Sequence, residues 1–194
     1  ANVLSAQVLN RHQDNLDLLF VDGNSGNAKV VLNEKDKAYV DVTDNLTFLK
    51  DNSFIWTSEK DGFNHIYLYD KNGKLKNQVT KGNWEVTSYY GFDEKTKSVF
   101  YQSVEKGSTL RDIYKISLDG KKKVRLSSET GTNSATFSPD FSLFINSFSS
   151  VTVPTIYTLN SATDGKQVQE IVNNNALADK LKKYDLPTKE FFEL

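Results

Sequence analysis

Residues 48–70 read FLKDNSFIWTSEKDGFNHIYLYD, and the outline of this stretch returns twice further along the chain. Its first residue, Phe48, has counterparts at Phe92 and Phe137, which follow at intervals of 44 and 45 residues. Five or six residues after each phenylalanine, a serine opens an apolar run. These serines are Ser53, Ser98 and Ser142. A regular interval of this length indicates a chain built from repeated structural units.

Each unit has the same order of predicted strands after its serine. An alternating or apolar strand comes first, at residues 54–58, 99–103 and 143–147. A polar turn then leads to a strand with an Ile-Tyr pair, which begins at Ile66, Ile113 and Ile156. A third strand follows an Asn-Gly or Asp-Gly turn, at residues 77–80, 124–126 and 168–172. These turn pairs favour the positive φ that tight hairpins need.

The strand around each repeated phenylalanine completes a unit of four antiparallel strands in about 45 residues, which is the size of a β-propeller blade. Residues 18–22 form a partial earlier copy of residues 66–70. We therefore predict an all-β fold, a partial β-propeller of about four blades, the first of them incomplete. The predicted blades, all in one propeller domain, cover residues 1–47, 48–91, 92–136 and 137–174.

Residues 175–194 depart from the repeat and predict a short helix followed by an exit strand. Asn175 is a candidate N-cap. Leu177 and Leu181 have the i,i+4 spacing that places both on one helix face, and Asp179 and Lys183 have the same spacing, which suits an ion pair. Pro187 stops the helix, and residues 188–194 then read as an extended strand.

Propellers close with four to eight blades, and each blade packs on two neighbours. If about four blades keep the curvature of a propeller with more blades, the ring stays open and the two terminal blades each leave an apolar face bare. We therefore expect this chain to be a segment of a larger propeller. The absence of any methionine agrees with that expectation. Bare faces and strand edges favour pairing with a second copy, so we predict that the chain self-associates as a dimer.

Composition excludes several classes of partner. With 24 Lys and Arg against 25 Asp and Glu and no long basic run, we expect no nucleic-acid partner. The short basic run at residues 121–123 reads as a solvated hairpin tip. No stretch approaches the roughly 20 apolar residues of a membrane span. Without cysteine there is no disulfide scaffold and no thiolate metal site, and we expect no cofactor.

Motifs for nucleophilic catalysis are absent or out of context. There is no Gly-x-Ser-x-Gly elbow, and a Ser-His-Asp triad would need His12 or His65. We interpret His65 as a hydrogen-bonded structural residue and His12 as a solvated turn residue. Ser103 and Lys106 have a Ser-x-x-Lys spacing, but at the end of a strand rather than the start of a helix. Residues 22–26 lack the glycine and glutamate spacing of an EF-hand and read as a turn.

Carboxylate pairs for glycoside hydrolysis stay open on composition alone. Four aspartates at predicted turns read as caps of their own backbone: Asp61, Asp93, Asp119 and Asp164. Glu59 and Glu85 are the more interesting candidates, because each neighbours an aromatic-rich strand. The structural alternative for each is an ion pair or a loop hydrogen bond. Trp56, Trp84 and the nine tyrosines either line a carbohydrate or peptide groove or pack between blades. We assign no catalytic, substrate-binding or metal-binding residue.

Residues 48–70 together with residues 80–86, Thr-Lys-Gly-Asn-Trp-Glu-Val, resemble the propeller of the bacterial dipeptidyl peptidase IV enzymes, a group in the prolyl oligopeptidase family of serine peptidases. Residues 137–140, Phe-Ser-Pro-Asp, also resemble a strand motif of that family. The resemblance extends over nearly the whole chain, through the predicted helix to the Leu-Pro-Thr-Lys-Glu-Phe exit at residues 186–191. It places the chain in the C-terminal half of the N-terminal β-propeller domain.

The resemblance implies a parent with an eight-bladed propeller that caps an α/β-hydrolase domain and releases Xaa-Pro or Xaa-Ala dipeptides from peptide N-termini. Its triad lies in the hydrolase domain, and its paired substrate-binding glutamates lie in another propeller segment. No Glu-Glu pair occurs here. None of these functional residues therefore has a matching position in this chain, and residues 39–47, near the substrate cavity in such enzymes, match too loosely for a role.

We therefore predict a non-catalytic propeller fragment of a periplasmic or secreted bacterial exopeptidase. In the parent, the propeller would gate and shape the chamber that receives peptide substrates, and its partner would be the α/β-hydrolase domain of the same chain. The alternative is a stand-alone β-propeller for protein interaction without an attached enzyme. A glycosidase or lyase propeller is a third interpretation.

Overall fold

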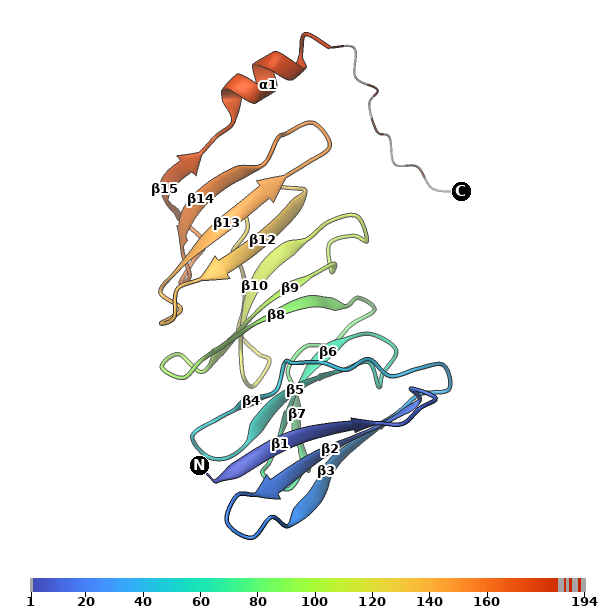
Figure 1. The fold of residues 1–194 in the computed structure, drawn as a ribbon. Helices are drawn as coiled ribbons and strands as arrows, with labels where there is room; N and C mark the ends of the chain where they lie inside the picture. The colour runs from blue at the N-terminus through green and yellow to red at the C-terminus, as the bar shows by residue number, and fades with distance from the viewer. Residues whose placement is uncertain (1, 185–186, 188, 190–191, 193–194) are drawn as a thin grey trace. The chain divides into compact units, whose positions relative to one another are not determined.

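The computed structural model describes residues 2–184 together with Pro187, Lys189 and Phe192. The chain forms two units, residues 1–83 and residues 84–194, and each unit contains two antiparallel sheets (Figure 1). Among the described residues, no helix has both the length and the apolar character needed to cross a membrane.

The first unit holds a three-stranded and a four-stranded sheet, and in both the strands pair in chain order. The three-stranded sheet consists of β1 (Val3–Leu9), β2 (Asn15–Asp22) and β3 (Ala28–Lys35). The four-stranded sheet consists of β4 (Thr47–Phe48), β5 (Phe54–Ser58), β6 (His65–Tyr69) and β7 (Leu75–Gln78). The three-stranded sheet is the incomplete first repeat that the sequence predicts.

The second unit holds two four-stranded sheets with the same simple order. One consists of β8 (Val86–Asp93), β9 (Ser98–Ser103), β10 (Asp112–Ser117) and β11 (Lys123–Arg125). The other consists of β12 (Thr132–Phe137), β13 (Leu143–Ser149), β14 (Ile156–Ser161) and β15 (Gln167–Val172). The predicted all-β organisation is therefore confirmed.

The tight turns between the third and fourth strands have the predicted backbone. Gly73, Gly120 and Gly165 have φ values of 84°, 75° and 77°. Glycine adopts this left-handed region without the steric cost of a Cβ. The Asn-Gly and Asp-Gly pairs thus close the hairpins at the positions where the sequence places them.

The outermost strand of the second sheet differs from its prediction, since β7 ends at Gln78 rather than at Thr80. Thr80 instead uses its hydroxyl oxygen to accept the Ile66 N–H at 2.9 Å. Ser127 does the same for the Ile113 N–H at 3.1 Å in the next sheet. Because a side-chain oxygen replaces a backbone carbonyl at these points, the regular strand ladder ends there.

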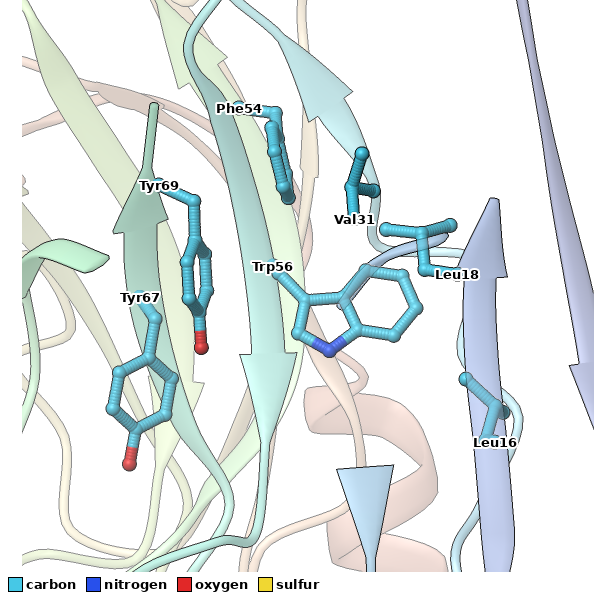
Figure 2. Close-up of a cluster of buried hydrophobic side chains, with 7 residues drawn as sticks. All are labelled: Leu16, Leu18, Val31, Phe54, Trp56, Tyr67 and Tyr69. Carbon is cyan, nitrogen blue, oxygen red and sulfur yellow. The ribbon is translucent and has the colours of Figure 1, made fainter. Parts of the chain in front are cut away.

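The core of the first unit lies between its two sheets (Figure 2). It consists of Leu16, Leu18, Val31, Phe54, Trp56, Tyr67 and Tyr69. Strands β5 and β6 are buried along their whole length, which explains the apolar runs at residues 54–56 and 66–69. Full burial of each large side chain contributes roughly 1.5–3 kcal/mol. The central strands of the sheet therefore anchor this unit.

The second unit has an equivalent core between its own two sheets. It consists of Phe100, Ile113, Leu126, Phe144 and Ala162. Tyr90 from β8 packs against this core, and its hydroxyl accepts the Ala135 N–H of β12 at 3.1 Å. This hydrogen bond joins the two sheets directly, in addition to their apolar contact.

The predicted helix forms as α1 (Asn175–Leu181), but its N-cap prediction is wrong. Asn174 occupies that position with φ of 55° and makes no side-chain capping bond. Its side-chain amide donates instead to the Thr155 carbonyl at 2.6 Å, which fixes the turn before the helix. Asp179 pairs with Lys182 at 2.9 Å rather than with Lys183. The exit strand predicted for residues 188–194 lies largely outside the described residues.

Candidate functional site

The two histidines have the structural roles that the sequence predicts. His65 is fully buried, with Nδ1 3.1 Å from the Thr80 hydroxyl and Nε2 3.0 Å from the Gly82 carbonyl oxygen. Because a carbonyl only accepts, Nε2 carries the proton and Nδ1 accepts from Thr80. His12 lies exposed in the turn between β1 and β2. Both ring nitrogens of His65 are therefore used in holding the end of β6.

Ser103 and Lys106 form no nucleophile and base pair. Ser103 closes β9 and is 1% exposed, whereas Lys106 lies exposed in the following loop. The Ser103 Oγ has no hydrogen-bond partner among the described residues, Lys106 included. The Ser-x-x-Lys spacing therefore has no catalytic geometry here.

Most turn aspartates hold their own backbone, as predicted. Asp93, Asp119 and Asp164 accept backbone N–H groups two residues ahead, at 2.9, 3.0 and 3.2 Å. Asp61 differs, because its carboxylate accepts from the Gln78 side-chain amide at 2.5 Å. Asp22 accepts the Ser25 N–H at 2.8 Å, so residues 22–26 form a turn. Within the described residues, no group of three or more His, Cys, Asp or Glu side chains could hold a metal ion.

Both tryptophans pack within the sheets. Trp84 stacks on Tyr101 with ring centroids 6.3 Å apart and an interplanar angle of 8°. Trp56 belongs to the core of the first unit and is 1% exposed. Glu59 and Glu85 both lie exposed, and the alternatives raised for their side chains stay predictions. Trp56 and Glu59 also border a cavity, which makes them part of the candidate site.

This cavity, of about 220 Å³, lies in the first unit beneath the connection between β3 and β4. Its floor comes from the end of β5, with Trp56, Thr57 and Ser58, and one side comes from the turn after β5. The connection itself, residues 36–46, forms the cover. The full lining is Glu34, Lys35, Asp36, Tyr39, Val40, Asp41, Val42, Thr43, Asn45, Trp56, Thr57, Ser58, Glu59, Lys60 and Asn64.

Hydrogen bonds hold the connecting segment over β5. The Thr43 hydroxyl lies 3.3 Å from that of Thr57, and the Asn45 amide donates to Thr57 at 3.1 Å. From the neighbouring sheet, the Gln7 amide donates to the Thr43 carbonyl at 2.6 Å. Val40 packs against the core and its N–H donates to the Gln13 carbonyl at 2.6 Å. The cover of the cavity is thus attached to both sheets of the unit.

Lys60, a residue of the cavity lining, contacts two tyrosines that lie outside the lining. The Lys60 ammonium donates to the Tyr69 hydroxyl at 2.6 Å and lies 4.0 Å from the centre of the Tyr67 ring. Burial lowers the pKa of Lys60, while the nearby Glu34 and Asp61 carboxylates oppose that shift. Burial also raises the pKa of both tyrosines, so their hydroxyls stay protonated at neutral pH. This lysine is therefore held by aromatic contacts as well as by charge.

The Trp56 indole brings an unused donor to this region. Figure 2 shows its nitrogen directed toward the same end of the sheet as the hydroxyls of Tyr67 and Tyr69. The Trp56 Nε1–H has no hydrogen-bond acceptor within the described part of the chain. Close by, the Ser58 hydroxyl donates to a Glu34 carboxylate oxygen at 2.7 Å. The cavity therefore has several carboxylates in its lining, and the Trp56 Nε1–H is buried with less than 1 Å² of accessible surface.

The sequence profile of the family described as the dipeptidyl peptidase IV (DPP IV) N-terminal region matches residues 1–155. The chain belongs to this dipeptidyl peptidase IV family. A dipeptidyl peptidase 4 from Arthroderma otae is 33% identical over 197 residues, which cover 97% of this chain and 25% of the relative. The enzyme of the same name from Trichophyton rubrum is 30% identical over 196 residues, again 97% of this chain and 25% of the relative.

A solved structure of dipeptidyl peptidase 4 from Porphyromonas gingivalis is also similar. Its TM-score is 0.92 at 38% sequence identity, over 98% of this chain and 27% of that protein. This likeness confirms the predicted partial β-propeller and the resemblance to the dipeptidyl peptidase IV propeller region. The chain spans about a quarter of the length of the curated relatives that it matches.

The cavity lies wholly inside the stretch that matches the dipeptidyl peptidase IV profile. Sequence reasoning singled out residues 39–47, Trp56 and Glu59, but it missed Glu34 and Lys60. One signal for the cavity itself was available, since the connection of 36–46 is longer than most strand connections. What the sequence could not show is that this connection folds back over the end of β5.

Proposed function

We propose that the chain is a non-catalytic part of the propeller of a dipeptidyl peptidase IV-like serine exopeptidase. The observation that supports this most directly is the match to Porphyromonas gingivalis dipeptidyl peptidase 4, with a TM-score of 0.92 over 98% of this chain.

In the whole enzyme, this propeller would help to wall a chamber that admits unfolded peptide ends and excludes folded proteins. Selection by access suits a rigid wall, and the cores of both units are closely packed aromatic and aliphatic side chains. Its partners would be the peptide substrate and an α/β-hydrolase domain of the same protein. We propose that the connection at 36–46 faces this chamber, because loops on a rigid scaffold are where binding groups concentrate.

The substrates would be peptides with proline or alanine in the second position, from which Xaa-Pro or Xaa-Ala dipeptides are removed. We also propose a periplasmic or secreted location, where such an enzyme meets extracellular peptides. Fractionation of cells that produce the whole protein, followed by detection in the periplasm or medium, tests the location. Recovery in the cytosol alone would contradict it.

The test of activity compares this chain with a version extended at both ends to the limits of its gene, using Gly-Pro and Ala-Pro chromogenic substrates. We expect the extended protein to cleave them and the 194-residue chain to be inactive. A folded, extended protein without activity would overturn the peptidase proposal and favour a propeller for protein interaction. Activity in the short chain would contradict its non-catalytic role.

A further inference from the structure

The turn between β6 and β7 contains the only Asn-Gly pair of the sequence, Asn72 and Gly73. An asparagine before a glycine loses its side-chain amide readily, because glycine has no Cβ to keep its backbone nitrogen away from the asparagine side chain. Asn72 is also exposed, so its side chain is open to water. The turn therefore combines a reactive pair of residues with access to solvent.

The reaction needs only water and these two residues. The deprotonated Gly73 nitrogen attacks the side-chain carbonyl carbon of Asn72, and a new C–N bond forms. The C–N bond to the side-chain NH₂ group breaks, and ammonia leaves with the proton that the Gly73 nitrogen lost. Water then opens the resulting succinimide ring at either carbonyl, which gives aspartate or isoaspartate. In isoaspartate the main chain runs through the former side chain and gains a methylene group.

Hydrogen bonds in the turn oppose the first step. The Gly73 N–H donates to the Asp70 carbonyl at 3.0 Å, so the attacking nitrogen is already engaged. The Asp70 carboxylate accepts the Asn72 N–H at 2.8 Å and the Lys74 N–H at 2.9 Å. To close the ring, the Gly73 nitrogen has to leave its hydrogen bond and turn toward the Asn72 side chain. The reaction therefore requires the end of the hairpin to open.

The two products differ in whether the hairpin can close again. A Cβ built on Gly73 would lie 1.7 Å from the Val31 carbonyl oxygen, so the main chain has no spare room at this point. Aspartate at position 72 keeps the length of the main chain. Isoaspartate adds a methylene group next to Gly73 and displaces it from Val31. Only isoaspartate is thus incompatible with the native turn.

We propose that Asn72 is a site of spontaneous conversion to isoaspartate, and that the hydrogen bonds of the turn suppress this conversion while the β6–β7 hairpin is closed. Local opening of a hairpin takes less free energy than unfolding of the whole chain. Because the ammonia is lost, each conversion is permanent. The fraction of isoaspartate at position 72 then reports how often this hairpin has opened.

The test compares conversion in the folded chain with conversion in guanidinium chloride, both at mildly alkaline pH. Chymotrypsin cuts after Tyr69 and Leu75 and releases residues 70–75. Chromatography with mass spectrometry separates the asparagine, aspartate and isoaspartate forms of this peptide. We expect conversion in the folded chain to be at least about tenfold slower than in the denaturant.

Matched variants test the role of the turn. Asp70→Ala removes the carboxylate that accepts two backbone N–H groups and leaves the reacting groups unchanged. It should speed conversion in the folded chain by about two- to tenfold and leave the rate in denaturant unchanged. Asp119→Ala removes a carboxylate that accepts the Lys121 N–H in another hairpin turn, and it should leave the rate at Asn72 unchanged in both conditions. Circular dichroism confirms that each variant is folded.

A further comparison tests the effect of the extra methylene group. The chain converted in denaturant and then refolded should unfold at a lower denaturant concentration than the Asn72→Asp variant. That variant has the charge of the product without the longer main chain, and it should match the unchanged chain.

Equal rates in the folded chain and in denaturant would overturn the proposal, and so would an absence of conversion at Asn72 in denaturant. Equal acceleration by Asp70→Ala and Asp119→Ala would contradict the role of the turn. If Asp70→Ala does not fold, the comparison of the folded chain with the denatured chain decides alone. None of these results depends on peptidase activity, so the test is independent of the proposed function.

Discussion

His65 shows how a residue type associated with catalysis can be committed to structure. Its two ring nitrogens bond Thr80 and the Gly82 carbonyl, and the Thr80 hydroxyl in turn accepts the Ile66 N–H. The four groups form a chain of hydrogen bonds around the buried side chains of His65 and Thr80. Such a network is worth most when every member is satisfied.

We predict that His65→Ala lowers the free energy of unfolding by about 2–4 kcal/mol, because it leaves a cavity and unpaired polar groups. Urea unfolding followed by circular dichroism measures the change. His12→Ala is the matched control, since the exposed position of His12 predicts a change within about 0.5 kcal/mol. Equal effects of the two substitutions would contradict the structural role of His65.

The carboxylate of Asp140 predicts a pH dependence of stability. Hydrogen bonds from the Ser138 and Ser142 hydroxyls and from the Ser142 N–H lower the pKa of Asp140 to about 2. An unfolded aspartate has a pKa of about 3.9. Because the folded pKa is the lower one, the stabilisation is present above about pH 4 and is lost as the pH falls toward 2.

We therefore expect Asp140→Asn to be less stable than the unchanged chain at about pH 5, with the difference disappearing near pH 2. Denaturation midpoints measured across this range test the prediction. A difference that grows as the pH falls would have the wrong sign and would refute the assignment.

The hairpin turn before β7 shows how a single element serves two purposes. Gly73 closes the turn with positive φ, and a Cβ built on it would lie 1.7 Å from the carbonyl oxygen of Val31 in β3. Gly165 has the same relation to the Leu126 carbonyl, at 2.2 Å, in the second unit. The glycine of the turn therefore also permits close approach between adjacent sheets.

We predict that Gly73→Ala destabilises the chain by more than about 3 kcal/mol, since it combines backbone strain with a clash against fixed backbone. Gly26→Ala is the control, because Gly26 has a similar φ of 74° but open space around the added Cβ. That variant should cost only about 1–2 kcal/mol, from the backbone alone. Thermal or urea unfolding of both variants measures the two costs. Equal costs would contradict the packing role of Gly73.

For the molecule as a whole, the edges of its sheets matter most for association. Strand β15 is exposed along its length, with Val168 at 60% and Ile171 at 47%. Strand β1 is the edge of its own sheet and exposes Leu4 at 65% and Val8 at 54%. Exposed apolar edge strands favour pairing with another chain.

We predict a dimer in solution at high concentration, which light scattering would detect. Val168→Lys places a charge on the β15 edge and should shift the population toward monomer. Val151→Lys changes an equally apolar residue, 49% exposed, that lies outside the strands, and it should have no effect. A monomer at every concentration would contradict the prediction.

Local rules account for much of the fold. The repeat interval, the Ile-Tyr strands and the Asn-Gly and Asp-Gly turns all depend on neighbours along the chain, and the structure has them where they were expected. The N-cap of α1 was misplaced because Asn174 is held by Thr155, which is distant in sequence. The end of β7 was misplaced because the Thr80 hydroxyl competes with the backbone for Ile66.

The amino-acid sequence alone was enough to establish an all-β repeat, the positions of its turns and the absence of a familiar catalytic motif. The reason is that side-chain periodicity and backbone preference act over a few residues. The candidate site depended on tertiary folding. Asp41 and Trp56 lie 15 positions apart, and they share a cavity because Gln7, Thr43 and Thr57 hold the connection across β5. Contacts of this kind join distant segments through hydrogen bonds and burial, and no local pattern encodes them.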